Sequence, residues 1–107
     1  MTMYEMQAEQ FKALSHPLRV KIIRVLSENK CCVTNLAKLC GEPQPQTSRH
    51  LNALKKAGLL ICEKKGTKAC YKASSPQVFK MIEAAGEIAK KRVLDSATEI
   101  KNKKGAK

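Results

Sequence analysis

The sequence predicts a mostly α-helical protein with one small β-hairpin, in the element order α-α-α-α-β-β-α. Apolar residues recur three or four positions apart in five segments, which is typical of helices that pack one face on a core. Two short segments flank Lys65-Gly66-Thr67 and are typical of strands joined by a turn. A length of 107 residues suits one compact domain. We therefore expect a single domain over residues 1–100 and a basic, flexible tail over residues 101–107.

Two helices are predicted in the first 30 residues. The apolar positions between Glu5 and Leu14 have loosely helical spacing. Ser15 can cap a second helix, and Pro17 suits its first turn because proline needs no hydrogen-bonded N–H there. That second helix is amphipathic and should face the core through Leu18, Ile22, Val25 and Leu26.

The middle of the chain predicts two short helices joined by a tight turn. Thr34 is a plausible cap for the first helix, and Gly41 can close it. Pro43 and Pro45 bracket the turn, and the second helix occupies residues 46–57. Two short helices connected in this way form the helix-turn-helix pattern.

A basic hairpin follows the two short helices. Its strands are expected at residues 59–64 and 68–73, and lysines gather near its tip. We interpret this hairpin as a wing, which makes the predicted fold a winged helix-turn-helix.

The last helix carries an apolar stripe that is too long for one small core. A symmetric dimer would cover the excess, and a helix packed along its own domain is the alternative. The first and last helices would supply the dimer interface, with the expected residues Phe11, Leu14, Val78, Ile82, Ala85, Ala89 and Val93.

The charge of the chain favours a polyanionic partner. Lys and Arg number 21 against nine Asp and Glu, which gives a formal net charge of +12. No apolar run approaches the roughly 20 residues that cross a bilayer, and the N-terminus does not look like a signal peptide. We therefore expect a cytoplasmic protein without a membrane partner and with its five cysteines reduced. The charge, taken with the predicted helix-turn-helix and wing, makes double-stranded DNA the expected partner.

The second helix of the pair presents hydrogen-bonding side chains on one face. Leu51 and Leu54 define its buried face together with Thr47, so Arg49 and Asn52 point outward. Arg, Gln and Asn can read base edges, whereas Ser and Lys more often hold phosphates. The expected DNA-binding set is Gln44, Gln46, Thr47, Ser48, Arg49, His50, Asn52 and Lys56, with Lys64, Lys65 and Lys68 on the wing.

The two histidines do not form a metal motif. His50 lies between the buried and exposed faces, where it could donate to a phosphate or satisfy a backbone group. His16 stands at a helix start, where local packing or capping is the expected role.

Three motifs in a fixed order carry a family resemblance. They are residues 13–19 (ALSHPLR), 44–51 (QPQTSRHL) and 54–60 (LKKAGLL). With these motifs the chain resembles the ArsR/SmtB family of repressors. The resemblance implies a winged-helix homodimer, joined by its first and last helices, that binds an inverted-repeat operator and leaves it when an effector is sensed. Carried over by position, Gln44, Ser48 and Arg49 fall where relatives touch DNA.

The resemblance also directs attention to Cys31 and Cys32. Relatives that sense arsenite or soft metals carry a Cys-Val-Cys trio where this chain reads Cys32-Val33-Thr34. A vicinal Cys31–Cys32 pair could rebuild the site and bind a thiophilic metal or arsenite as a small inorganic effector. Oxidation or persulfidation of one thiol is a second reading, and ordinary structural cysteines without any bound cofactor are a third. The zinc site that other relatives place on the last helix looks absent, because residues 77–107 contain no His and no Cys.

The other cysteines have weaker signals. Cys62 and Cys70 lie on the two wing strands and would face each other in one hairpin register. Cys40 shares an apolar face with leucines and is expected in the core.

Two other function classes compete with the repressor. A protein of this charge could bind nucleic acid without sequence preference, as an architectural or RNA-binding protein, and an ArsR-like protein could lack a cysteine effector site. An enzyme is not expected, because the chain has no Cys-x-x-Cys motif and no acid/base pair spaced for catalysis.

Overall fold

Over the residues that the structure describes, the chain forms five helices and three strands. The computed structural model describes the backbone of residues 1–28 and 31–105 and the side chains of residues 1–28 and 33–97. The elements are α1 (Met3–Ala13), α2 (Pro17–Glu28), β1 (Cys31–Cys32), α3 (Val33–Cys40), α4 (Gln44–Lys56), β2 (Leu60–Lys65), β3 (Lys68–Ala73) and α5 (Pro76–Gly105). The order α-α-β-α-α-β-β-α keeps the predicted helices and hairpin and adds β1, which the sequence analysis did not predict.

Helix α1 begins earlier than predicted because Thr2 caps it. The Thr2 hydroxyl accepts a hydrogen bond from the Glu5 N–H at 3.1 Å, and the Glu5 carboxylate accepts one from the Thr2 N–H at 3.1 Å. This reciprocal capping box satisfies two N–H groups that a helix start otherwise leaves unpaired. The hydrogen bonds from Thr2 also lower the pKa of Glu5.

Two predicted caps are wrong. The Ser15 hydroxyl donates to the Lys12 carbonyl at 2.6 Å, so it closes the end of α1 instead of capping α2. Helix α3 begins at Val33, which places Thr34 inside its first turn. Pro17 does begin α2, as predicted.

The core lies where α2, α3 and α4 meet the base of the hairpin. It contains side chains that are at most 2% exposed, namely Ile22, Ile23, Leu36, Thr47, Leu51, Leu54, Leu59 and Leu60. Each buried aliphatic side chain contributes about 1.5–3 kcal/mol relative to exposure. This packing buries one face of α4 in the core and leaves its other face to solvent.

The three strands form an antiparallel sheet in the order β1-β3-β2. In the hairpin, Lys65 pairs with Lys68, and Gly66 takes a φ of 63° in the two-residue turn between them. Glycine suits that position because other residues rarely adopt positive φ. Strand β1 pairs with the opposite edge of β3, which ties the segment before α3 to the wing.

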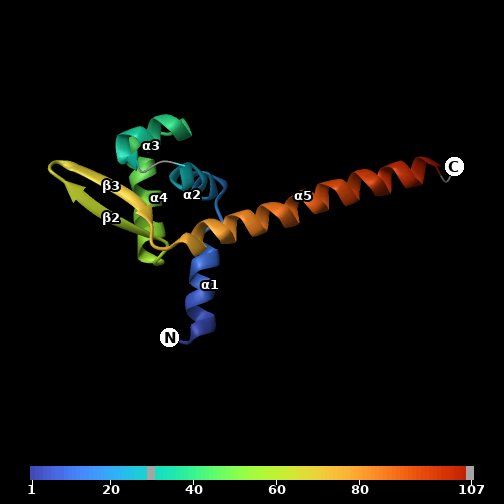
Figure 1. Ribbon diagram of the computed structural model, residues 1–107, viewed down its shortest axis with the longest axis horizontal. Helices are drawn as coiled ribbons and strands as arrows, with labels where there is room; N and C mark the ends of the chain where they lie inside the picture. Colours follow the sequence, from blue (N-terminus) through green and yellow to red (C-terminus); the bar gives the residue numbers. More distant parts are fainter. Residues whose placement is uncertain (29–30, 106–107) are drawn as a thin grey trace.

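Helix α5 extends far beyond the body of the molecule (Figure 1). Val78 is buried in the core, and Phe79 and Ile82 pack against it, but residues 83–97 are exposed throughout. The helix continues to Gly105 and so includes residues 101–105 of the segment interpreted as a tail, whereas residues 106–107 lie outside the described part of the chain. In the part that the structure describes, no helix is long and apolar enough to cross a membrane.

Candidate nucleic-acid interface

Helix α4 separates its side chains into a buried face and an exposed face. Leu51 and Leu54 are fully buried, as predicted, and they belong to the hydrophobic core. On the other side, polar or charged side chains are exposed at Gln44, Gln46, Arg49, Asn52 and Lys56, and Ser48 is half-buried. The exposed face therefore offers donors and acceptors of the type that read base edges and hold phosphates.

Thr47 does not belong to this exposed face, which corrects its place in the predicted DNA-binding set. Its side chain is 0% exposed, and its hydroxyl donates to the Pro43 carbonyl at 3.1 Å. The hydroxyl satisfies a carbonyl one turn earlier and cannot reach a groove of DNA.

The start of α4 suits a phosphate. Pro43 is the cap residue, Pro45 lies in the first turn, and that turn contains no acidic residue. The first N–H groups of a helix lack intrahelical partners, and the helix dipole places partial positive charge there. A phosphate of a nucleic-acid backbone would accept hydrogen bonds from these N–H groups.

His50 contacts a side chain of α2, which neither of its two predicted roles anticipated. The Arg19 Nε donates to His50 Nδ1 at 3.0 Å, and Arg19 Nη1 donates to the Ala13 carbonyl at 3.2 Å. One guanidinium thus joins the end of α1, α2 and the exposed shoulder of α4. Burial lowers the pKa of His50, and the charges of Arg19 and His16 lower it further. The His16 ring lies against the His50 ring with centroids 5.9 Å apart, consistent with the packing role predicted for His16.

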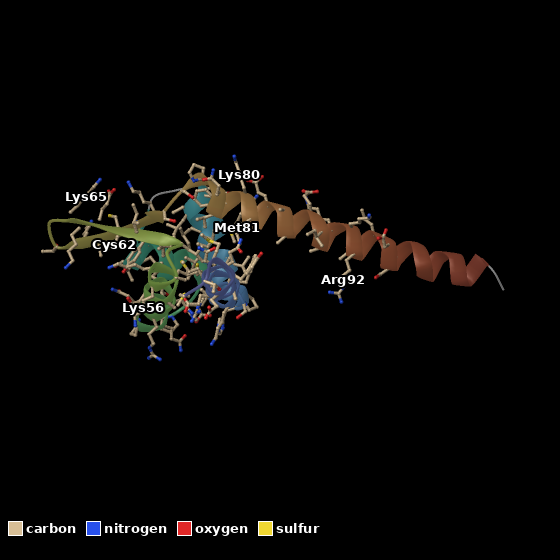
Figure 2. The ribbon with its side chains drawn as sticks, turned by 90° about the horizontal axis from the view of Figure 1, so that it is seen from below. Lys56, Cys62, Lys65, Lys80, Met81 and Arg92 are labelled. Atoms are coloured by element: carbon tan, nitrogen blue, oxygen red, sulfur yellow. The ribbon has the colours of Figure 1, made fainter. Side chains whose placement is uncertain are left out.

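The wing carries its lysines at the far end of the hairpin. Lys64, Lys65 and Lys68 are all exposed, as the sequence analysis expected for phosphate contacts. Figure 2 shows Lys65 on the hairpin and Lys56 on α4 at the end of the molecule remote from Arg92 of α5. The wing lysines and the far part of α5 therefore lie toward opposite ends of the molecule.

A hollow of about 360 Å³ lies where α4 and the wing approach each other. It lies between the first turns of α3 and α4 and the wing, and it contains both Gln44 and Lys68. Thr34 and Asn35 also line it and are exposed, yet sequence reasoning assigned no DNA contact to them. Polar residues in the first turn of the first helix of a helix-turn-helix were the signal that could have found them.

The predicted cysteine sites are distributed over both faces of the sheet. Cys62 pairs with Tyr71 and Cys70 pairs with Glu63, so Cys62 and Cys70 occupy opposite faces and do not oppose each other. Both are half-buried free thiols, and burial together with Cys62 raises the pKa of Tyr71. Cys40 is buried in the core, as predicted.

The side chains of Cys31 and Cys32 lie outside the described residues, but their backbone forms β1. Cys31 pairs with Tyr71 and Cys32 pairs with Cys70. Consecutive positions of a strand alternate between faces, so these two residues belong to different faces of the sheet. Among the side chains that the structure describes, no group of three His, Cys, Asp or Glu is arranged to hold a metal ion.

The expected dimer residues divide into three kinds. Val78 is only 4% exposed within its own subunit, so it is a core residue and not an interface residue. Leu14 and Ile82 are half-buried against that core. Phe11, Ala85, Ala89 and Val93 are exposed, and sequence reasoning overlooked the exposed Leu94 beside them, which lines an apolar hollow with Ala89 and Val93.

Known proteins resemble this chain in sequence and in fold. A sequence model of the family described as bacterial regulatory protein, arsR family, matches residues 16–61, from the residue before α2 into β2. An HTH-type transcriptional regulator of Methanocaldococcus jannaschii is 39% identical over 89 residues, which cover 82% of this chain and 100% of that protein. The arsenical resistance operon repressor of Escherichia coli K12 is 38% identical over 65 residues, which cover 60% of this chain and 56% of the repressor.

A solved structure shows the same architecture. The homodimeric winged helix-turn-helix DNA-binding domain of a possible ArsR-family transcriptional regulator from Mycobacterium bovis matches with a TM-score of 0.76 at 25% identity, covering 81% of each chain. The wing beside α4, the exposed polar face of α4 and these similarities lead to one assignment. The chain belongs to the ArsR/SmtB family of winged helix-turn-helix transcriptional repressors.

Proposed function

We propose that this protein is a homodimeric, effector-responsive repressor that inserts α4 of each subunit into the major groove of an inverted-repeat operator in the cytoplasm. The observation that carries the proposal is the exposed polar face of α4, held by a buried opposite face beside a basic wing. A helix held in this way can enter a groove without giving up its packing on the core.

The side chains divide the work of binding by their chemistry. Arg49 and Gln46 have the donors that discriminate base edges. Lys65 and Lys68 supply positive charge for phosphates, whatever the DNA sequence. Base contacts then set the sequence, while lysine contacts set the overall affinity and its dependence on salt.

The exposed apolar surface of α5 supports a dimer. Val93 is 68% exposed and Leu94 is 65% exposed, far from the core of their own subunit. A second copy of α5 can cover both, and a symmetric pair would then present two α4 helices to two half-sites. The Mycobacterium bovis domain, which is homodimeric, has the same fold.

The test of this function is a footprint on the DNA upstream of the protein's own gene, with random duplex as competitor. We expect protection of an imperfect palindrome whose half-sites lie about one or two helical turns apart. Arg49→Ala should weaken operator binding by about 1–3 kcal/mol without a matching loss on random DNA. Arg24→Ala is the control, because Arg24 is exposed on α2 and pairs with Glu28. Loss of DNA binding in the control variant alone would contradict the proposed interface.

A non-specific nucleic-acid-binding protein is the second candidate, favoured by the net charge of +12. The same competition separates the two candidates. Equal affinity for operator and random DNA would support this alternative and overturn the repressor.

We further propose that cysteines of the β1 segment, Cys31 and Cys32, sense the effector, either a thiophilic metal or metalloid or an oxidant or persulfide. The similarity to the Escherichia coli arsenical resistance operon repressor supports an arsenical effector, which would need thiolate ligands. The alternation of Cys31 and Cys32 between two faces of the sheet is unfavourable for a vicinal pair that must clasp one ion, because such ions need two or three convergent sulfurs. This alternation therefore favours sensing of an oxidant or persulfide over binding of a thiophilic metal or metalloid.

The sensor is tested by measuring release from operator DNA with arsenite, cadmium, zinc, hydrogen peroxide and a persulfide donor in turn. Cys31→Ser and Cys32→Ser variants identify the thiol responsible. If both variants respond like the unmodified protein to every effector, the sensor assignment is wrong, while the DNA-binding assignment stands.

A further inference from the structure

The backbone pairs Cys32 of β1 directly with Cys70 of β3. Directly opposed residues of an antiparallel ladder have Cα atoms about 4.5 or 5.5 Å apart, depending on the type of pair. Disulfides join Cα atoms about 4.4–6.8 Å apart. Either type of pair therefore falls within the Cα separations that disulfides span.

The register gives no other cysteine an equivalent partner. Cys31 and Cys62 both pair with Tyr71, so they share a face but stand on the two outer strands with β3 between them. Two strand spacings amount to about 9–10 Å, beyond the reach of a disulfide. Cys40 is 6% exposed within the helical core. Cys32 and Cys70 are the pair that the sheet itself brings together.

We propose that Cys32 and Cys70 form a reversible intrachain disulfide when the protein meets a hydroperoxide, and that this bond reports the oxidant to the DNA-binding surface. The inference rests on the proposed repressor function and deepens it by naming the second thiol. The sequence did not indicate Cys70 as the partner of Cys32, because the two-residue strand β1 has no recognisable sequence pattern.

The reaction balances with the peroxide as oxidant. One thiolate attacks the O–O bond, takes one oxygen as a sulfenic acid and releases water or an alcohol. The second thiol then attacks the sulfenic sulfur, forms the S–S bond and expels a water molecule. The two thiols lose two electrons, the peroxide gains them, and a dithiol reductant reverses the process.

The position of the bond explains how oxidation would reach DNA. Cys32 immediately precedes α3, and Cys70 lies in the middle of a wing strand. The closed loop between them contains α3, α4 and β2, which are the elements that form the proposed DNA surface. A covalent link between β1 and β3 therefore fixes the wing relative to the helix-turn-helix, whereas the reduced form holds them by the strand ladder alone.

Peptide mapping tests the pairing on the full-length protein. Reduced protein is treated with hydrogen peroxide, alkylated and digested with trypsin without reduction. We expect residues 31–38 linked to residues 69–72, since cleavage after Lys and Arg isolates Cys70 from Cys62 in residues 57–64. Cys32→Ser and Cys70→Ser should abolish the link, and the matched controls Cys31→Ser and Cys62→Ser should retain it. A link that survives Cys32→Ser, a link to residues 57–64, or no link at all overturns the proposal.

Operator binding tests the consequence. The oxidised protein should differ from the reduced protein by about tenfold or more in operator affinity, the scale of an ordinary allosteric coupling. Peroxide should not change the affinity of Cys70→Ser, and Cys62→Ser should respond like the unmodified protein. Equal affinities of the linked and reduced forms would overturn the sensing role. Failure of the reduced protein to prefer operator over random DNA would instead overturn the proposed function, whatever the mapping shows.

Discussion

The Nε of Arg19 donates a hydrogen bond to Nδ1 of His50 at 3.0 Å, and this contact ties α2 to the shoulder of the exposed face of α4. The contact requires a neutral imidazole, because a proton on Nδ1 would remove the acceptor and place a cation against the guanidinium. Protonation of His50 would therefore break this hydrogen bond between α2 and α4.

The stability of the protein should therefore fall in mild acid. The pKa of His50 is lowered from its ordinary value of 6.5, chiefly by burial and then by Arg19. As the pH falls below 6.5, the unfolded chain protonates this imidazole before the folded chain does, so the free energy of unfolding decreases until the pH passes the folded pKa. Denaturant titrations between pH 8 and about pH 5 measure this slope.

His50→Gln is the matched variant, because its amide oxygen can still accept from Arg19 and does not titrate. We expect a shallower pH dependence of unfolding in this variant. Identical slopes for the variant and the unmodified protein would show that His50 does not control the transition.

The elements that the sequence predicted are those whose signal is local. Five helices and a hairpin follow from apolar spacing and turn residues, and the buried face of α4 was placed at Leu51 and Leu54. Strand β1 has only two residues, too few to show an alternating apolar pattern. It forms through pairing with β3, nearly 40 positions later in the sequence. The Thr2–Glu5 capping box was readable and was overlooked.

The candidate site was predictable as a surface but not as a set of contacts. Helical periodicity identified the outward residues of α4, but it could not reveal that His50 meets Arg19 from another helix. Nor could it separate Val78, which the subunit buries itself, from Val93, which it leaves exposed, because both lie on one apolar stripe. Tertiary packing determines which side chains meet and which are buried, and a local sequence pattern does not show that packing.

Thr47 should affect stability and not DNA recognition. Replacement of Thr47 by Val keeps the shape but removes the hydroxyl that donates to the Pro43 carbonyl. Loss of one buried hydrogen bond should lower the free energy of unfolding by about 1 kcal/mol. Chemical denaturation measures this change, and operator affinity at a temperature where both proteins are folded should be the same. A large loss of affinity in a fully folded Thr47→Val would return this residue to the DNA-binding set.

The wing lysines should control the salt dependence of binding. Each phosphate contact contributes about one unit to the slope of log affinity against log salt, so Lys65→Ala and Lys68→Ala should each reduce the slope by about 1. Both substitutions should weaken operator and random DNA alike. Lys80→Ala is the control, since Lys80 is exposed on α5, away from Lys65 near the tip of the wing (Figure 2). An unchanged slope in both wing variants would mean that the hairpin does not contact the DNA backbone.

The exposed apolar surface of α5 should hold the dimer together. Val93→Glu places a charge on the helix face that contains Ala89 and Leu94, and a carboxylate there cannot be buried against a second copy without a large cost. We expect a monomer by sedimentation and a loss of operator affinity, because one α4 cannot span two half-sites. Helical folding of the subunit should persist, since Val93 makes no contribution to its core. Lys91→Glu introduces the same side chain about 160° away around the helix and should remain dimeric; a dimeric Val93→Glu would exclude this face as the interface.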